Sequence, residues 1–281
     1  MKRSTLVDWA REAVEAANRG SYLINGGIKV DISNAVRSCL NATRLFNPTE
    51  LKQLCSDTLA NSGIGFATKL EVANETTLAG IARLLAEAGG PIAALNFASA
   101  KNPGGGFLRG SQAQEESLAR SSALYASLMQ AWDFYEKHRA LPSKLYSDAM
   151  ILSPGCPVFR NDEGAWLADP HLVSFITAAA PNACALSQNQ SKELASLWDV
   201  FRRRSEYVLA VAAAHGYSRL VLGAWGCGVF GNNPELVASV FADHLRGTWS
   251  GRFERVLFSV LDTSENQDTF DAFRCALFQG D

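Results

Sequence analysis

The sequence lacks the cysteine and histidine patterns that zinc sites require. Its six cysteines stand singly, with no C-x-x-C pair, at Cys39, Cys55, Cys156, Cys184, Cys227 and Cys275. The four histidines are equally scattered and form no H-E-x-x-H motif. Single cysteines also argue against a disulfide framework and favour buried, reduced thiols. We therefore expect neither a metal nor another cofactor.

An excess of charge of one sign and a long apolar run are missing too. The chain of 281 residues has 26 basic and 28 acidic residues, which leaves no overall electrostatic footprint for duplex nucleic acid or an anionic membrane. Charges interrupt "MKRSTLVDWAREAVEAANRG", where a signal peptide needs an apolar core, and no later run reaches the length of a membrane span. We expect a cytoplasmic protein that binds neither a membrane nor duplex nucleic acid.

The apolar residues that are present suffice for one large domain, since they make up 47% of the chain. Up to residue 62, their spacing predicts helices over residues 5–18, 34–46 and 49–60, and Gly26-Gly27 predicts a hairpin. From residue 63 the pattern alternates between strands (66–74, 91–98, 149–159, 171–181, 219–228, 253–262) and helices (75–88, 112–130, 132–138, 187–215, 234–245, 269–278). This alternation predicts an α/β domain over residues 63–281, with residues 1–62 as a mainly helical extension packed on it.

Two glycine-rich loops follow predicted strands. "NPGGGFLRG" comes after "IAALNFA", and "GCGVFGNNPE" comes after "RLVLGAW". Ligands of open α/β sheets bind at the carboxyl ends of strands, where glycine lets backbone amides approach them closely. A helix N-terminus beside such a loop favours an anion, so we expect the loops to hold a diphosphate.

The second loop also matches the G-x-G-x-x-G fingerprint of dinucleotide-binding oxidoreductases. Two features weigh against that class. Asn233 and Pro234 are a natural N-cap and first helical residue, which places the helix start after the last glycine. The match also lies near the end of the chain instead of in a first βα unit. Phe230, between the glycines, either packs on the ligand or fixes the loop to the core.

The first loop runs into two adjacent glutamates, Glu115 and Glu116, at the start of a predicted helix. The simplest explanation is stabilisation of the helix dipole, worth about 0.3–1 kcal/mol. Adjacent helical residues diverge by about 100°, so the pair cannot flank a scissile bond as the two carboxylates of an ordinary glycosidase do. A division of labour fits better, with one carboxyl group as acid and base and the other holding ribose hydroxyls.

The segment "GGGFLRGSQAQEE" resembles the signature of the poly(ADP-ribose) glycohydrolases (PARGs). "LGAWGCGVFGNNP", "VANETTL" and "ITAAAPN" are similar to segments of the microbial type, and the likeness runs from about residue 72 to the end of the chain. The resemblance implies a macrodomain-like fold, a three-layer arrangement of a mixed sheet between helices, with ADP-ribose bound in a cleft. The implied activity is hydrolysis of ribose–ribose O-glycosidic bonds in poly(ADP-ribose), from chain ends, with release of ADP-ribose.

The same resemblance assigns roles to residues. Glu116 would be the general acid and base, and Glu115 would orient the same ribose. The remaining ligand-binding candidates come from the two loops and the strand before the first: Asn96, Asn102, Gly104, Gly105, Gly106, Gln114, Gly226, Cys227, Gly228, Val229, Phe230 and Gly231. Cys227 is expected to fill space beneath the ligand, and Gln114 to support its loop.

Two other functions fit the same motifs. The site could remove single ADP-ribose groups from a protein or nucleic-acid acceptor, or the protein could be an ADP-ribose reader without catalytic activity. The intact glutamate pair favours an enzyme, because a binding module needs the glycine loops but not the acid.

Overall fold

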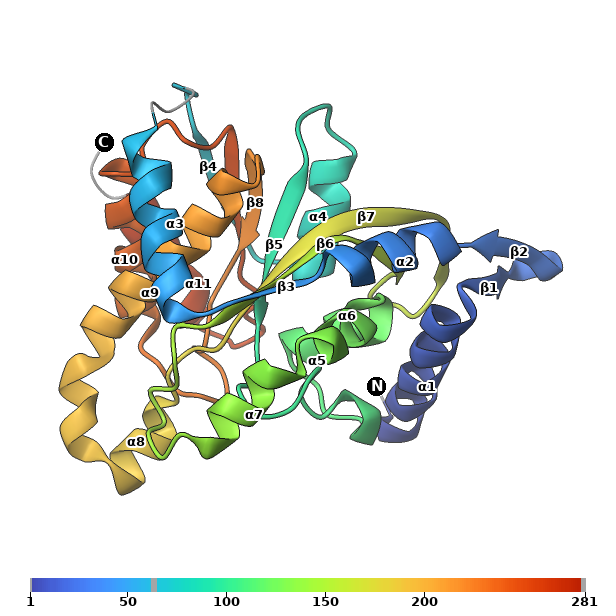
Figure 1. Ribbon diagram of the computed structural model, residues 1–281, viewed down its shortest axis with the longest axis horizontal. Helices are drawn as coiled ribbons and strands as arrows, with labels where there is room; N and C mark the ends of the chain where they lie inside the picture. The colour runs from blue at the N-terminus through green and yellow to red at the C-terminus, as the bar shows by residue number, and fades with distance from the viewer. Residues whose placement is uncertain (1, 62–64, 279–281) are drawn as a thin grey trace.

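The computed structural model describes residues 2–61 and 65–278 and has a seven-stranded mixed sheet at its centre (Figure 1). The strand order is β3-β6-β7-β5-β8-β9-β4. The strands are β3 Arg44–Phe46, β4 Lys69–Ala73, β5 Ile92–Phe97, β6 Met150–Arg160, β7 Trp166–Ala178, β8 Arg219–Leu222 and β9 Arg255–Ser259. Helices cover both faces of this sheet, which confirms the predicted three-layer, macrodomain-like α/β fold.

The helices divide between the two faces. Their bounds are α1 Arg3–Arg19, α2 Ser33–Ala42, α3 Pro48–Ala60, α4 Thr77–Leu85, α5 Gln114–Ser121, α6 Leu124–Gln130, α7 Trp132–Ala140, α8 Ala183–Asn189, α9 Leu197–Ala214, α10 Pro234–Arg246 and α11 Asp268–Phe278. One core cluster joins the sheet to α3, α9, α10 and α11, and the other joins it to α1, α2 and α4–α7. Central strand β5 is buried between them, so its apolar run is continuous instead of alternating.

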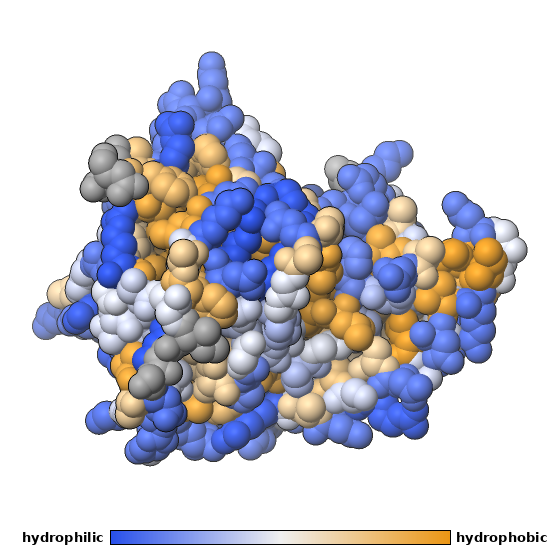
Figure 2. Space-filling view, turned by 90° about the horizontal axis from the view of Figure 1, so that it is seen from above, coloured by the Kyte–Doolittle hydropathy of each residue, from blue (hydrophilic) through white to orange (hydrophobic). Residues whose placement is uncertain are grey.

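The predicted hairpin is present and projects from one end of the molecule (Figure 1). Strands β1 Ser21–Ile24 and β2 Ile28–Asp31 pair antiparallel around Gly26 and Gly27. Tyr22 fastens the hairpin to the body, because its ring stacks on Trp166 with centroids 4.6 Å apart. Leu23 and Ile28 are 56% and 61% exposed, and apolar atoms gather at this end of the surface in Figure 2.

Two predicted helices are shorter because their sequences meet the sheet. The helix expected over residues 34–46 ends at Ala42, and residues 44–46 form β3, antiparallel to β6. The helix expected over residues 112–130 is broken at Ser122, whose backbone is extended and bridges to Val158 of β6. Both interruptions depend on a partner strand more than thirty residues away in sequence, so local periodicity did not predict them.

The long helix expected over residues 187–215 is also wrong. The structure has α8, a 3-10 segment at Ser191–Ser196, and then α9. The predicted strands are all present, with β4, β8 and β9 shorter than expected and β7 beginning earlier, at Trp166.

The N-terminal residues are interwoven with the rest of the chain. Strand β3 forms one edge of the main sheet, and α3 packs on α9. Arg252 donates hydrogen bonds to the carbonyls of Thr58 and Leu59 at 3.2 and 3.3 Å. The predicted boundary between residues 62 and 63 falls in residues 62–64, outside the described residues, so the division into two units stays a prediction.

No helix in the described ranges combines the length and the apolar character needed to cross a membrane.

Buried Arg204 joins α9 to Asp148, just before β6, and to the end of β7. The Arg204 side chain is 1% exposed, and its Nη2 lies 3.0 Å from Oδ1 of Asp148. Its Nη1 donates to the carbonyl of Ala179, directly after β7. Arg203 binds the other oxygen of Asp148 at 2.6 Å but is 44% exposed. Because the next residue, Ala180, lines the cleft described below, this pair helps to set the cleft wall.

The two arginines give a matched test of this anchor. We expect Arg204→Met to lower the free energy of unfolding by about 3–5 kcal/mol, because it leaves Asp148 without its buried partner. Arg203→Met should cost less than about 1 kcal/mol, as an exposed pair does. Urea unfolding of both variants measures the difference, and equal losses would contradict the proposed anchoring role of Arg204.

Candidate active site

A cleft of about 960 Å³ opens at the carboxyl ends of β5, β8 and β9. Its walls come from the loops after these three strands, from the start of α4 and from Leu6 and Trp9 of α1. This volume lies near the upper end of the roughly 300–1,000 Å³ found for small-molecule sites. Both glycine-rich loops reach it, as the sequence predicted.

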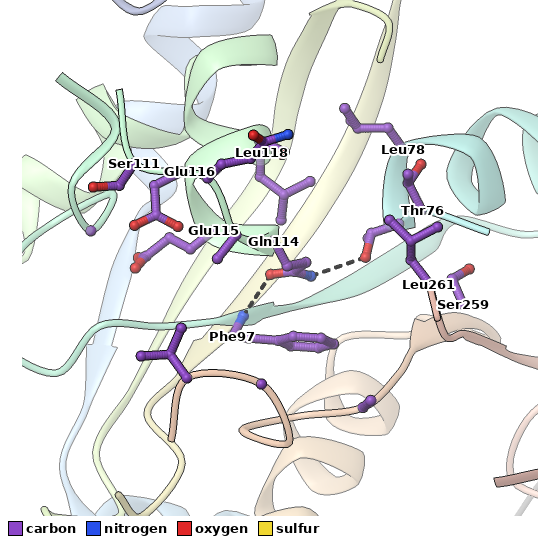
Figure 3. Close-up of a pocket in the computed structure, with 18 of the residues that line it drawn as sticks. Thr76, Leu78, Phe97, Ser111, Gln114, Glu115, Glu116, Leu118, Ser259 and Leu261 are labelled. Atoms are coloured by element: carbon purple, nitrogen blue, oxygen red, sulfur yellow. Dashed lines mark hydrogen bonds between the residues drawn. The ribbon is translucent and has the colours of Figure 1, made fainter. Parts of the chain in front are cut away.

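Gln114 docks α5 onto the end of β5 (Figure 3). Its Oε1 accepts a hydrogen bond from the Phe97 N–H at 2.9 Å. Its Nε2 donates to the Leu95 carbonyl at 2.7 Å and to Thr77 Oγ1 at 3.1 Å. Both amide donors of Gln114 are therefore used within the protein, and the side chain supports the start of α5 instead of offering donors to a ligand.

Glu115 is buried directly behind the cleft surface, with 3% of its area exposed. Its carboxyl group accepts hydrogen bonds from the Ser99 N–H at 2.6 Å and from Asn96 Nδ2 at 3.3 Å. Burial raises the pKa of Glu115 to about 8, against the opposing effect of these hydrogen bonds. Glu115 is therefore mostly protonated and uncharged at neutral pH.

Glu116 is partly exposed and lies next to Glu115 and Ser111 in the cleft (Figure 3). Its Oε1 accepts a hydrogen bond from the Gly106 N–H at 2.9 Å. Gly105 has a φ of +60°, and a Cβ there would lie 2.9 Å from the Glu116 Cδ. The glycines thus make room for the carboxyl groups themselves, a role that the sequence did not reveal.

The second loop faces the glutamates across the cleft. Residues 226–230 line it, and Val229 is 82% exposed at its rim. The predicted start of α10 is confirmed, because the Asn233 side chain accepts hydrogen bonds from the backbone N–H groups of Glu235 and Leu236. Phe230 lines the cleft and packs against the core, so the loop is fixed to the core, and its contact with a ligand stays a prediction.

Cys227 is held in its neutral form. Burial raises the pKa of its thiol to about 12, so the thiolate that a nucleophile needs is absent at neutral pH. This environment agrees with the predicted role as a small residue that fills space in the cleft wall.

Three predicted ligand-binding residues do not line the cleft. Asn96 is fully buried beneath Glu115 and lies outside the cleft surface, so contact between its side chain and a ligand stays an untested prediction. Gly104 faces Phe107, and Gly231 faces Cys184 on the outer side of its loop. Sequence position alone does not show which way a strand residue or a loop glycine faces.

Several cleft residues were not predicted. Thr76 at the N-cap of α4 donates to Asp162 at 2.5 Å, and the Phe97 ring lies below Gln114 in Figure 3. Leu261 after β9 and Arg120 of α5 complete this group. They come from segments that meet only in the folded chain. Thr76 lies in the family-like segment "VANETTL", and Phe97 and Arg120 lie on either side of the family-like "GGGFLRGSQAQEE". In the described ranges, no group of three or more His, Cys, Asp or Glu side chains could hold a metal ion.

The buried position of Glu115 predicts a pH-dependent stability. Its folded-state pKa of about 8 lies above the ordinary glutamate value of 4.5, so the folded state binds more protons between these values. The contribution of Glu115 to the free energy of unfolding is fully present below pH 4.5 and is lost as the pH rises through about 8. The free energy of unfolding of Glu115→Gln, relative to that of wild type, should therefore rise by on the order of a few kcal/mol between pH 5 and pH 9.

Chemical denaturation at a series of pH values measures this difference. Glu15→Gln is the control, since that side chain is 70% exposed, and it should follow the wild-type curve. If Glu115→Gln also follows the wild-type curve, Glu115 is not held in its protonated form.

Comparisons with known proteins identify relatives over nearly the whole chain. The model of the family "microbial-type PARG, catalytic domain" matches residues 10–161. The PARG of Thermomonospora curvata is 45% identical, with 97% of this chain and 99% of that chain covered and a TM-score of 0.93. A structure of the T. curvata enzyme bound to the inhibitor ADP-HPD is also 45% identical, with 96% and 98% covered and a TM-score of 0.89.

The PARG of Deinococcus radiodurans in complex with ADP-ribose is 45% identical, with 90% of this chain and 100% of that chain covered and a TM-score of 0.84. A search of curated proteins gave no match. The family model spans more than half of the chain and the structural relatives almost all of it, so the chain belongs to the microbial-type PARG family.

Proposed function

We propose that the protein hydrolyses ribose–ribose O-glycosidic bonds in poly(ADP-ribose), releases ADP-ribose, and uses Glu116 as general acid and base. The observation that carries the proposal is the position of the Glu116 carboxyl group. It lies in the cleft lined by the two glycine loops, where the Gly106 N–H holds it by a hydrogen bond. Relatives bound to ADP-ribose and to ADP-HPD support the substrate class.

The reaction needs two proton transfers, one from Glu116 and one back to it from water. Protonated Glu116 gives its proton to the leaving ribose oxygen, and the electron pair of the broken C–O bond stays on that oxygen. The resulting oxocarbenium-like carbon is attacked by water, whose proton passes to the Glu116 carboxylate. The acid is then restored, and no covalent intermediate with the protein is required.

The surrounding residues favour this course. Uncharged Glu115 can hold a ribose hydroxyl without placing a second negative charge beside Glu116. The backbone of residues 226–230, which lines the cleft, favours the diphosphate. Gly105, with no Cβ, leaves room for the Glu116 carboxyl group beside the first loop.

Glu116→Gln tests the acid–base role. Hydrolysis of labelled poly(ADP-ribose) should fall by about 10²–10⁴-fold, the usual contribution of general acid–base catalysis, because the amide cannot give and recover a proton. ADP-ribose binding, measured by calorimetry, should stay within about threefold of wild type, because the amide keeps the size of the side chain.

The control is Glu235→Gln, which changes an exposed glutamate in the first turn of α10. It should hydrolyse polymer at the wild-type rate. Glu235 and Glu116 both lie in the first turn of a helix, where a carboxylate stabilises the helix dipole, but only Glu116 is proposed to act as the acid. Wild-type turnover by Glu116→Gln would remove Glu116 from the mechanism.

Other substrates separate the alternatives. Wild-type protein that leaves polymer intact but frees ADP-ribose from a mono-ADP-ribosylated protein or DNA would be a mono-ADP-ribosyl hydrolase. Protein that binds ADP-ribose and cleaves none of these substrates would be a reader. The cytoplasmic location and the absence of duplex nucleic-acid binding stay predictions.

We also propose that cleavage starts at chain ends. Leu6 and Trp9 of α1 and the loop after β9 both stand in the cleft wall, which supports a closed pocket for one terminal unit. Early samples of a digest of long polymer should therefore contain ADP-ribose and shortened chains. Oligomeric fragments among the first products would show internal cleavage instead.

A further inference from the structure

Arg120 is a buried cation with no ion-pair partner among the described residues. Its side chain lies in the cleft wall with 3% exposure, one helical turn after Glu116 on α5. In residues 2–61 and 65–278, the other buried arginines all lie within ion-pair distance of a carboxylate: Arg160 of Glu12, Arg204 of Asp148, Arg219 of Glu87, and Arg255 of Glu71 and Glu87. Arg120 has no such pair in that part of the chain, and burying an unpaired charge is costly.

The contacts of Arg120 lead back to Glu116. Its Nη1 donates to the Ser111 carbonyl at 2.7 Å, and the Ser111 N–H donates to the Gly106 carbonyl at 3.2 Å. The Gly106 N–H in turn donates to Glu116 Oε1 at 2.9 Å. Glu116 and Arg120 lie four residues apart on one helix face. The hydrogen bonds through Ser111 and Gly106 therefore connect Arg120 to Glu116 by way of the first loop.

Glu116 also attracts the charge of Arg120. Burial lowers the pKa of Arg120, and the attraction of the Glu116 carboxylate opposes that effect. An arginine stays protonated at any pH of interest, so its positive charge is constant through the reaction. The charge of Glu116, in contrast, appears when it gives up its proton and disappears when it recovers one.

We propose that Arg120 is a positioning residue for Glu116. It fixes the Gly106–Ser111 loop that orients the acid, and its charge stabilises the Glu116 carboxylate in the middle of the reaction. The inference rests on the proposed acid–base function of Glu116 and adds the residue that acts through it.

Other charged groups around this part of the cleft stay the same in the variants below. They include Glu115 on α5, Arg109 at the end of the 3-10 segment Phe107–Arg109, Arg160 on β6, Arg3 and Glu12 on α1, and Glu75, Asp162 and Asp262 in the cleft lining. Arg160 donates to the backbone carbonyl of Arg120 and is itself paired with Glu12. A changed pH profile in an Arg120 variant is therefore assigned to the lost charge of Arg120.

The test compares Arg120→Met with Arg120→Lys in polymer hydrolysis. For Arg120→Met we expect kcat to fall by about 10–100-fold, below the full contribution of acid–base catalysis, with KM within about threefold of wild type. The alkaline limb of its pH profile should move to higher pH, because the loss of a neighbouring positive charge makes a carboxyl group harder to deprotonate. Arg120→Lys keeps the charge and should keep the wild-type limb, with a several-fold lower kcat because lysine lacks the guanidinium fork that reaches Ser111.

The outcomes separate this inference from the proposed function. Wild-type kcat and pH profile in Arg120→Met, or a loss of thermal stability alone, would leave Arg120 a structural residue. If Arg120→Met does not fold, a shifted alkaline limb in folded Arg120→Lys contradicts the inference by itself. Wild-type protein without turnover on polymer contradicts the proposed function and this inference together.

Discussion

The site depends on how the free edge at the end of β5 is closed. Strand β8 pairs with β5 only as far as Ala94 and then turns away, so the peptide groups of Leu95 and Phe97 on that side lose their strand partner. The Gln114 amide takes this place, with one donor on the Leu95 carbonyl and its oxygen on the Phe97 N–H. Gln114, which begins α5, thus satisfies the backbone groups left unpaired where β5 and β8 separate at the cleft. The two glutamates that follow Gln114 are thereby fixed relative to the sheet.

Two adjacent carboxyl groups on one helix meet different surroundings as a result. Glu115 points under the first loop toward buried Asn96, whereas Glu116 points into the cleft and touches only the Gly106 amide among its described polar neighbours. Separation of environments is how proteins assign different tasks to similar acids. Here the difference follows from the angle between consecutive helical residues and from the depth at which Gln114 seats the helix.

The sequence predicted the elements that depend on local patterns. The buried run of β5, the hairpin at Gly26-Gly27 and the start of α10 at Asn233 and Pro234 are confirmed, and the two glycine loops do meet at one cleft. The failures depend on contacts between distant segments. Ser122 breaks a helix because Val158 pairs with it, and residues 44–46 form a strand because β6 offers an edge. Likewise, the order of residues shows neither the burial of Asn96 nor that Arg120 is buried without an ion pair in residues 2–61 and 65–278.

The edge strand β3 gives the N-terminal segment a protective role. Without it, the outer side of β6 would expose a row of unsatisfied peptide groups, which is a ready template for another chain to add a strand. The segment also crosses from α1 at the cleft wall to α3 on the opposite face of the sheet. Segments that border the substrate and segments that guard against aggregation are therefore consecutive in the chain, and a shortened protein that starts at the glycine-rich core would lose solubility along with one wall of its cleft.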